Sequence, residues 1–377
     1  MASSLRKATV RGSQAWAREV RGQSQQYLRK QSSFAQLEPE MKARKIRPIF
    51  DDMTPQYSYR LDTALADFMP GISPPKILAA PARHLPLPIP HHLLYFEPAK
   101  PPSELLPDGT NPDQSPGEPF VRRMWAGGAV HYNTANPLYM DNSRGVCIEG
   151  IRDVAVKGKP GEEKVFVGIE RRMATITSDE HKCLAACSTH PDKIAELEDN
   201  IRARLWMPND TEFGPASIIE RRNIVFMRER SSEEAKAAVE ASRKPGKMLK
   251  PQHEPDFTHT LVPDAQLLFR YSALTFNAHS IHLDAGYCQH VEGHRHLLVH
   301  GPLSFTLLVS LLQNHLKSTG SNEVVNYVEY RNLAPLYAYE PLKLCGRKAE
   351  APGRWDVWAE TPEGGIAVKG TIKTRTA

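Results

Sequence analysis

The apolar pattern is strongest in residues 267–312, where we predict a strand, a polar turn rich in histidine and a long helix. The strand covers residues 267–274. The helix begins at Gly301 and Pro302, because proline at a first helical position removes no donor that the helix uses. Leucines recur along it at helical spacing: Leu303, Leu307, Leu308, Leu311 and Leu312. This order places free backbone N–H groups and the positive end of a helix dipole beside the histidine-rich turn.

Four segments after this helix have the pattern of antiparallel strands. They cover residues 324–333, 336–345, 355–360 and 366–374. Residues 303–312 are apolar nearly all round, which is typical of a helix that contacts protein on every side. We therefore predict a sheet wrapped round a buried helix in the C-terminal half.

The N-terminal half repeats this order with a weaker helix, predicted over residues 52–68. Its strands are predicted at residues 129–132, 145–156, 164–176 and 217–228, with a helical insertion at 189–205. Two such units would hide their exposed strand edges by joining their sheets edge to edge. The predicted fold class is α+β, with two antiparallel sheets that are each wrapped round a central helix.

A proline-rich segment separates the first predicted helix from the strands. Residues 70–119 contain 14 of the 31 prolines, which disfavours regular helix or a central strand there. Apolar clusters at 85–89 and 93–96 indicate a long ordered loop over a domain. Residues 231–256 are charged and interrupted by proline, and we predict them to be the linker between an N-terminal unit, residues 41–230, and a C-terminal unit, residues 257–377.

Charge adds a prediction about the N-terminus. The chain of 377 residues has a net charge of +5, and residues 1–37 carry seven basic residues against one acid, Glu19. Serine, glutamine and sparse apolar positions fill the gaps. This composition favours a mitochondrial presequence, predicted over residues 1–40, and hence a location in the matrix. The alternative is a disordered basic tail. No run approaches 18 uninterrupted apolar residues, so we predict no membrane helix.

Five scattered cysteines argue against a secreted disulfide framework and favour a reducing compartment. One group of residues has the composition of a zinc site: His181, Cys183, Cys187 and His190. Its spacing matches no common structural zinc motif. We therefore interpret these side chains as part of a helix surface and predict no metal site.

The histidine-rich turn contains the best candidates for catalysis. Histidine titrates near neutral pH, so His282 could take and return a proton. The amide of Asn277 could hold a water molecule, and the backbone N–H of Gly301 could stabilise an enolate oxygen. These groups suit the addition or removal of water beside a thioester carbonyl. Local chemistry supports a catalytic and a structural role for His282 equally, and it favours structural roles for His279, Asp284 and His300.

Two blocks of sequence resemble the (R)-specific enoyl thioester hydratase superfamily, the MaoC-like double hot-dog proteins. The C-terminal block runs from Phe269 to Asp284 and continues at residues 298–303. The N-terminal block comprises residues 93–96, 103–109 and 122–128. Within the superfamily, the chain resembles most closely the branch of fungal mitochondrial hydroxyacyl-thioester dehydratase type 2 and mesaconyl-CoA hydratase. The resemblance runs from about Thr54 to the C-terminus and implies a double hot-dog fold.

The resemblance implies that His282 is the motif histidine and that Gly301 supplies the oxyanion donor. Asn277 stands where the wider superfamily has aspartate; because an amide cannot accept a full proton, acid–base work falls mainly on His282, with Asn277 orienting water. Ser280 and Leu283 stand where the branch commonly has Arg and Tyr, which leaves recognition of the head group open. The candidate substrate-binding residues are Arg270, Ser272, His300 and Trp125.

The implied function is dehydration of (3R)-hydroxyacyl groups on acyl carrier protein to trans-2-enoyl thioesters in mitochondrial fatty acid synthesis, without a metal or redox cofactor. The C-terminal unit would carry the chemistry, and the N-terminal unit would shelter the acyl chain. The nearest alternative is a CoA-linked hydratase for a branched or dicarboxylic enoyl group, such as mesaconyl-CoA. A non-catalytic thioester-binding protein and a nucleic-acid binder are further alternatives. A homodimer is left open.

Overall fold

The computed structural model describes residues 34–73, 85–187, 190–244, 246 and 248–376. Most of the predicted presequence lies outside these residues. The described α-helices are α2 (Leu37–Lys42), α3 (Gln56–Leu65), α4 (Ser178–Cys187), α5 (Pro191–Leu205), α6 (Ser232–Ser242), α7 (Ala265–Leu274), α8 (Ala285–Tyr287) and α9 (Gly301–Ser318). Shorter helical turns are η1 (His91–Leu94), η2 (Pro102–Glu104), η3 (Ser280–His282) and η4 (Cys288–Glu292). In this part of the chain, no helix combines the length and apolar character that crossing a membrane requires.

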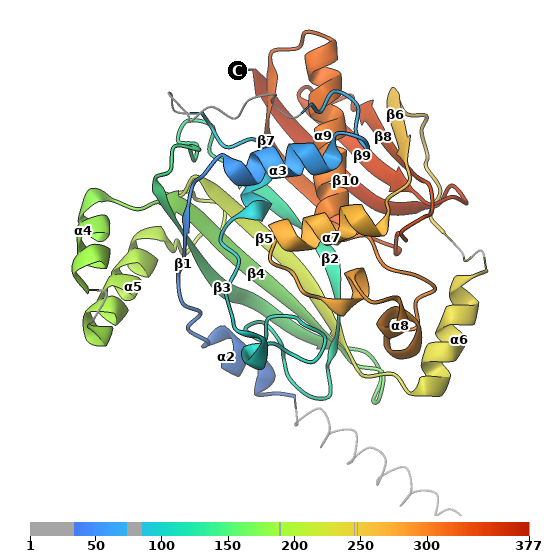
Figure 1. Cartoon of the computed structure of the whole chain (residues 1–377), viewed down its shortest axis with the longest axis horizontal. Helices are drawn as coiled ribbons and strands as arrows, with labels where there is room; N and C mark the ends of the chain where they lie inside the picture. The colour runs from blue at the N-terminus through green and yellow to red at the C-terminus, as the bar shows by residue number, and fades with distance from the viewer. Residues whose placement is uncertain (1–33, 74–84, 188–189, 245, 247, 377) are drawn as a thin grey trace, which may run out of the picture.

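One continuous antiparallel sheet of ten strands forms the frame of the molecule (Figure 1). Its strands are β1 (Ile49–Asp52), β2 (Arg122–Tyr132), β3 (Arg144–Lys157), β4 (Lys164–Thr175), β5 (Ile218–Met227), β6 (Phe257–Leu261), β7 (Glu323–Asn332), β8 (Leu342–Lys348), β9 (Arg354–Glu360) and β10 (Ile366–Thr376). Their order across the sheet is β1-β3-β4-β5-β2-β7-β10-β9-β8-β6. The strands before the linker therefore form one half of the sheet, and those after it form the other.

The two halves join edge to edge, as predicted, so the two expected sheets are one. β2 pairs with β7 over residues 127–131. Glycine makes this close joint feasible, because a Cβ atom on Gly127 would overlap the carbonyl oxygen of Tyr330. A Cβ atom on Gly128 would likewise overlap the carbonyl oxygen of Arg221 on the other neighbouring strand. The paired glycines thus let β2 contact both of its neighbours at backbone distance.

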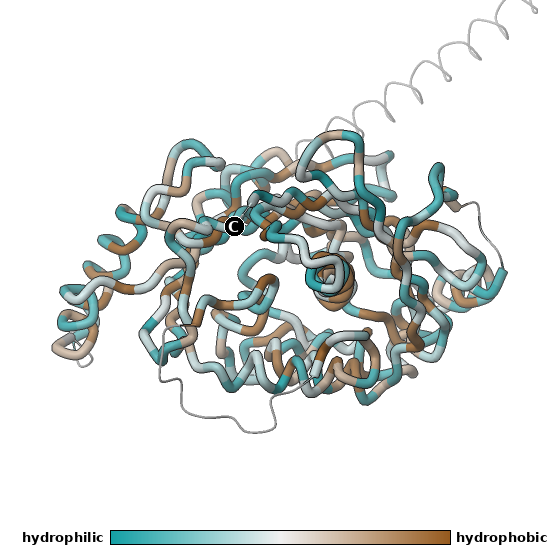
Figure 2. The backbone as a smooth tube through the Cα atoms, turned by 90° about the horizontal axis from the view of Figure 1, so that it is seen from above, coloured by the Kyte–Doolittle hydropathy of each residue, from teal (hydrophilic) through white to brown (hydrophobic). Residues whose placement is uncertain are grey.

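The long helix α9 lies inside the curve of the sheet, where Figure 2 views it end-on. It begins at Gly301 with Pro302 at its first turn, as the sequence predicts. Its leucines at the predicted spacing are all buried, and they belong to a core cluster that draws on both halves of the chain. The prediction of a sheet wrapped round a buried helix is therefore confirmed for the C-terminal half.

The inner side of the N-terminal half is covered differently. Helix α3, the turn η1 and residues 93–96 contribute the buried side chains there, including Leu61, Leu65 and Phe96. Helix α5, in the predicted insertion, and helix α4, which precedes it and was not predicted, project beside this half in Figure 1. The described residues of the N-terminal half contain no second long central helix like α9. The prediction of one central helix in each unit therefore holds in full only for the C-terminal unit.

The predicted strand over residues 267–274 is wrong, because this segment is helix α7. Buried residues fall at 267, 268, 271 and 272, while 269 and 270 are exposed, which is the period of a helix and not of a strand. The Asp264 side chain caps the helix by accepting a hydrogen bond of 2.7 Å from the backbone N–H of Leu267. α7 packs beside α3 on the inner side of the sheet (Figure 1).

Smaller differences concern the ends of elements. β8 begins at Leu342, after Pro341, so residues 336–341 of the predicted strand are loop. Strands β1 and β6, at the two edges of the sheet, were not expected. Residues 231–256, the predicted linker, contain helix α6, which starts with a capping box formed by Ser231 and Glu234.

Candidate active site

The histidine-rich segment between α7 and α9 is held in place by backbone hydrogen bonds. The N–H of Asn277 donates to the carbonyl of Ser272 at 2.8 Å, which turns the chain sharply at the end of α7. The N–H of Leu298 donates to the carbonyl of Ile281 at 3.0 Å, and Leu298 also forms a bridge to Tyr337. Residues 297–300 therefore run alongside η3, and His282 and His300 become neighbours.

His282 is buried and has one anchored ring nitrogen. Its Nδ1 lies 2.8 Å from the carbonyl oxygen of Leu298. Because a carbonyl only accepts hydrogen bonds, Nδ1 carries the proton and donates, and Nε2 keeps its lone pair. Burial lowers the pKa of His282 to about 4, although the bond to Leu298 opposes this shift. At neutral pH the ring is therefore an uncharged base whose Nε2 bonds to no described residue.

His300 lies directly against His282. The two rings are stacked, with centroids 3.6 Å apart and planes at 21°. The Nε2 atom of His300 is 2.8 Å from the hydroxyl oxygen of Ser272 on α7. Burial lowers the pKa of His300, and His282 and His279 lower it further. His300 and Ser272, two predicted substrate-binding residues, thus form a hydrogen-bonded pair that fixes the orientation of the His282 ring.

Gly301 follows His300 and opens α9, so its N–H lies beside the stacked imidazoles. This N–H donates to no other described residue, and it stands at the positive end of an 18-residue helix. An added Cβ atom would lie 2.7 Å from Nδ2 of Asn332 and 3.3 Å from the side chain of Trp125. Asn332 also donates to the carbonyl of Trp125 at 2.8 Å. Residues from both halves of the sheet therefore enclose this helix end.

Asn277 lies on the same turn as His282 without a hydrogen bond to it. Its amide oxygen accepts a hydrogen bond of 3.0 Å from the backbone N–H of His279. Its amide nitrogen bonds to no described residue and keeps its donors for another partner. This geometry allows Asn277 to donate to an oxygen of the substrate or of water, but not to act as a base.

The remaining candidates divide clearly. The structure brings Trp125 to the N-terminus of α9, where its indole N–H donates to the hydroxyl of Tyr330 at 2.7 Å. Arg270, in contrast, is exposed on α7, away from the buried face that carries Ser272. Leu283 is exposed, and Asp284 caps α8 by accepting a hydrogen bond from the N–H of Tyr287. The structure thus brings His282, His300, Ser272 and Trp125 together around Gly301 at the start of α9, places Asn277 on the same turn as His282, and leaves Arg270 outside the site.

Sequence reasoning assigned no role to Asp108 and Arg123. Both come from the N-terminal half, and both lie near His279, whose Nε2 is 3.5 Å from the Asp108 carboxylate. Nε of Arg123 is 3.8 Å from the same carboxylate oxygen. The two residues fall within the N-terminal blocks of the family resemblance, but no local pattern in those blocks points to the histidine-rich turn.

The N-terminal half buries a network of ion pairs as well as the two histidines of η1. Arg171 is fully buried, and its guanidinium lies 3.2 Å from both Glu149 and Glu220. It also donates to the backbone carbonyl of Phe96. Burial alone would raise the pKa of Glu220, but Arg222 and Arg171 outweigh it and lower this pKa to about 2. These side chains are buried and paired with one another, so we assign them to the scaffold.

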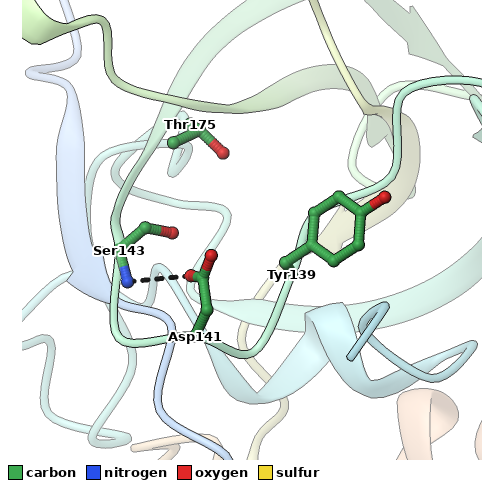
Figure 3. Close-up of a pocket in the computed structure, with 4 residues that line it drawn as sticks. All are labelled: Tyr139, Asp141, Ser143 and Thr175. Atoms are coloured by element: carbon green, nitrogen blue, oxygen red, sulfur yellow. Dashed lines mark hydrogen bonds between the residues drawn. The ribbon is translucent and has the colours of Figure 1, made fainter. Parts of the chain in front are cut away.

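A surface pocket on the N-terminal half contains no comparable chemistry (Figure 3). Tyr139, Asp141 and Ser143 line it from the connection between β2 and β3, and Thr175 lines it from the end of β4. The Asp141 carboxylate accepts a hydrogen bond of 3.0 Å from the backbone N–H of Ser143. This pocket shares no residue with the His282 site.

The residues considered for zinc lie on the insertion. His181 and Cys183 are exposed on α4. Among the described residues there is no group of three or more side chains placed to hold a metal ion. The candidate site is therefore the histidine-rich turn and the start of α9.

Comparison with known proteins gives consistent results. The family model of hydroxyacyl-thioester dehydratase type 2 matches residues 90–199 and 208–338. Mesaconyl-C(4)-CoA hydratase of Chloroflexus aurantiacus is 31% identical over 308 residues, which cover 80% of this chain and 88% of the relative. Mitochondrial hydroxyacyl-thioester dehydratase type 2 of Schizosaccharomyces pombe is 27% identical over 262 residues, 68% of this chain and 76% of the relative.

The fold also matches solved structures. A MaoC-like dehydratase from Phytophthora capsici superposes with a TM-score of 0.50 and 11% identity, covering 89% of this chain and 98% of that chain. This likeness concerns the arrangement of helices and strands and agrees with the fold expected from the sequence.

Proposed function

The chain belongs to the hydroxyacyl-thioester dehydratase type 2 family, and on that premise we propose that it interconverts (3R)-hydroxyacyl and trans-2-enoyl thioesters as a hydro-lyase. One observation carries the proposal. A neutral imidazole, His282, has Nδ1 anchored on Leu298 and an unpaired Nε2, and its ring stacks on the residue that precedes the N-terminus of α9. A base and an oxyanion donor are thus fixed side by side, as removal of a proton next to a carbonyl requires.

The mechanism follows from this geometry. The thioester oxygen accepts a hydrogen bond from the Gly301 N–H, and Nε2 of His282 takes the proton from C2. The electron pair of the broken C2–H bond first forms the enolate and then the C2–C3 double bond, while the hydroxyl group leaves C3. One oxyanion donor typically contributes about 10²- to 10³-fold to kcat. The Asn277 amide N–H donates to the departing oxygen, which also needs a proton to leave as water.

We propose acyl carrier protein as the carrier and mitochondrial fatty acid synthesis as the setting. One observation supports this: the relative from Schizosaccharomyces pombe is a mitochondrial hydroxyacyl-thioester dehydratase. The N-terminal presequence and a matrix location belong to the same proposal. Import into isolated mitochondria, followed by N-terminal sequencing, tests them; an uncut chain that stays outside the organelle would contradict them.

A second function has specific support. The relative from Chloroflexus aurantiacus is a mesaconyl-C(4)-CoA hydratase and shares 31% identity. A CoA-linked hydratase for a branched dicarboxylic enoyl group would use the same His282 and Gly301, since the chemistry at C2 and C3 is the same. The two functions differ in the carrier and in the acyl group.

The test is hydration of crotonyl groups attached either to acyl carrier protein or to CoA, with mesaconyl-CoA as a third substrate. Preference for the carrier-bound form supports the fatty acid function, and strong preference for a CoA thioester removes it. His282→Ala and Asn277→Ala are compared with the wild type. If all three proteins bind the thioester and none hydrates it, the chain is a thioester-binding protein.

A further inference from the structure

A turn from the N-terminal half packs tightly against the histidine-rich turn. The backbone N–H of Ser280 donates to the carbonyl of Asp108 at 2.9 Å. Gly109 has a φ of +82°, and a Cβ atom there would overlap the carbonyl oxygen of Ala278. The turn is closed by a hydrogen bond of 2.8 Å from the N–H of Gly109 to the carbonyl of Leu106. Backbone contacts therefore place the Asp108 side chain next to residues 278–280.

The Asp108 carboxylate is buried and only half satisfied. Its Oδ1 accepts hydrogen bonds from the backbone and side chain of Thr110. Its Oδ2 has no hydrogen-bond partner, and the buried His279 Nε2 that faces it at 3.5 Å has none either. Leaving such groups unpaired inside a protein is costly, and more so when they are charged. Nε of Arg123, at 3.8 Å, is unpaired as well and faces the same oxygen.

The distance of 3.5 Å is slightly longer than an ordinary N–H···O hydrogen bond. Catalytic hydrogen bonds are often long in the unliganded enzyme and tighten when substrate binds. If His279 donates from Nε2 to Asp108, its Nδ1 is the nitrogen left for other chemistry. The hydrogen bonds of His279 with other described residues involve its backbone and leave Nδ1 without one.

His279 and His282 thus have matching arrangements. Their rings meet edge to face, with centroids 5.6 Å apart and planes at 84°. His282 is anchored through Nδ1 on Leu298 and has a free Nε2. His279 faces Asp108 through Nε2 and has a free Nδ1. The two anchored imidazoles lie on one turn, beside the start of α9.

The reaction needs two proton transfers, one at C2 and one at the departing oxygen. The position that would suit a carboxylic acid is occupied by Asn277, whose amide cannot transfer a proton. Resting on the proposed function, we propose that His279 is the second proton-transfer residue and that Asp108, from the N-terminal half, is its positioning residue. His282 acts at C2, and His279 acts at the oxygen on C3.

The proton balance is simple. Dehydration starts with His282 neutral and with His279 in its protonated form, which forms when the Asp108 carboxylate closes from 3.5 Å to hydrogen-bond distance and acts as its counter-ion. The C2–H bond breaks and its proton goes to Nε2 of His282; the C2–C3 double bond forms, the C3–O bond breaks, and the oxygen takes the proton from Nδ1 of His279. One proton then passes from His282 back to His279, directly or through solvent. Hydration runs through the same steps in reverse.

Among the described residues, the charged or titratable groups near His279 are Asp108 on the turn from the N-terminal half, Arg123 on β2, His282 on η3 and His300 before α9. Burial lowers the pKa of His279, and His282 and Arg123 lower it further. A carboxylate brought within hydrogen-bond distance has the opposite effect, since it stabilises the imidazolium. The alkaline limb of the dehydration pH profile therefore depends on Asp108.

The experiment compares His279→Asn and Asp108→Asn with the wild type in both reaction directions. We expect His279→Asn to lower kcat roughly 10²- to 10⁴-fold with little change in KM. Asp108→Asn keeps the size of the side chain but removes the counter-ion, so we expect a smaller loss of kcat and an alkaline limb shifted to lower pH. The double variant should be no slower than His279→Asn alone, because the two residues act as one unit.

Matched controls come from the same segments. Asp113→Asn alters a carboxylate on the same loop that pairs with Lys100, and His290→Asn alters an exposed histidine on η4; both should retain wild-type kcat. Thermal unfolding of each variant checks folding.

The assignment of His279 and Asp108 would be overturned if His279→Asn kept the wild-type kcat, or if Asp108→Asn left the pH profile unshifted. In either case, hydration by the wild type would leave the proposed function intact. A folded wild type that hydrates no thioester would overturn both.

Discussion

The buried polar side chains around Arg171 and those around His282 avoid an unpaired charge in opposite ways. Beneath the N-terminal cover, Arg171 is ionised and paired with Glu149 and Glu220. Beside α9, the buried His282 and His300 are kept uncharged, since burial lowers the pKa of both. Both solutions avoid an unpaired buried charge, which is very costly.

This difference supports our proposal that the chemistry lies at His282 and not at Arg171. The carboxylates and the guanidinium group around Arg171 bind one another. They stabilise the scaffold and are not available to a substrate. Neutrality leaves one nitrogen of His282 with a lone pair that can accept a proton. The four predictions that follow test the contrast between the ion-paired Arg171 network and the uncharged His282 site.

The largest effect is expected for His282→Ala. Removal of the base that acts at C2 should lower kcat for crotonyl thioester hydration by roughly 10²- to 10⁴-fold. The loss is measured from steady-state rates, and binding of the enoyl thioester should persist because the Gly301 N–H remains. His253→Ala, at an exposed histidine of the linker, serves as the control with unchanged kcat. Equal rates for both variants would remove His282 from the mechanism.

The next effect concerns stability in the N-terminal half. Arg171→Met leaves Glu149 and Glu220 without their shared cation, so the free energy of unfolding should fall by about 3–5 kcal/mol. Urea denaturation measures this change. The matched change Arg354→Met removes an exposed ion pair with Asp356 and should cost at most about 1 kcal/mol. A similarly small effect of Arg171→Met would mean that the buried network does not hold this half together.

A smaller effect is expected at the start of α9. In Gly301→Ala the new Cβ atom would come within 2.7 Å of the Asn332 side chain, so the helix end must shift by a few tenths of an ångström. We expect kcat to fall about tenfold, because oxyanion donors act only at short distance. Gly246→Ala, where a Cβ atom meets nothing within 4 Å, is the control. If the rate is unchanged, the Gly301 N–H does not contact the reacting oxygen.

The smallest effect is a difference in pH dependence. The folded-state pKa of His282, about 4, lies below the ordinary value of 6.5 because of burial, so its contribution to stability is present above pH 6.5 and is lost as the pH falls toward 4. For Glu220, burial is outweighed by Arg222 and Arg171, and the pKa falls from 4.5 to about 2. The stability that ionised Glu220 contributes is therefore lost as the pH falls from 4.5 to about 2.

Urea denaturation at several pH values separates the two groups. His282→Gln should flatten the dependence of unfolding free energy on pH between 6.5 and 4, and Glu220→Gln should flatten it between 4.5 and 2. If both variants flattened the dependence over the same pH range, the contrast between the uncharged His282 and the paired Glu220 would be contradicted.

The sequence predicted those features that depend on local pattern. The leucine spacing and Gly301-Pro302 were enough to predict α9, and alternating strands were enough to predict the joined sheet. Residues 267–274 were predicted wrongly because a short apolar run fits a strand or a buried helix, and only the cap at Asp264 decides between them. The edge strands β1 and β6 have four and five residues, too few for a clear pattern.

The candidate site also has features that the sequence predicted and features that it did not. His282, Asn277 and Gly301 were found because they lie on one turn and one helix end, and the family motif contains them. Their roles in catalysis stay predictions. The contact of Asp108 with His279 was not predicted, because it joins residues far apart in the sequence and depends on how a proline-rich loop packs. The exposure of Arg270 depends on the helical state of α7, which the sequence reading missed.

The glycine-lined joint between β2 and β7 bears on how the molecule can be divided. A fragment that begins at β6 would expose the whole hydrogen-bonding edge of β7, which invites self-association of fragments. It would also lack Asp108 and Trp125, so even a soluble fragment would have an incomplete site. We therefore expect the two halves to fold as one unit, and a fragment of either half to lose solubility, turnover or both.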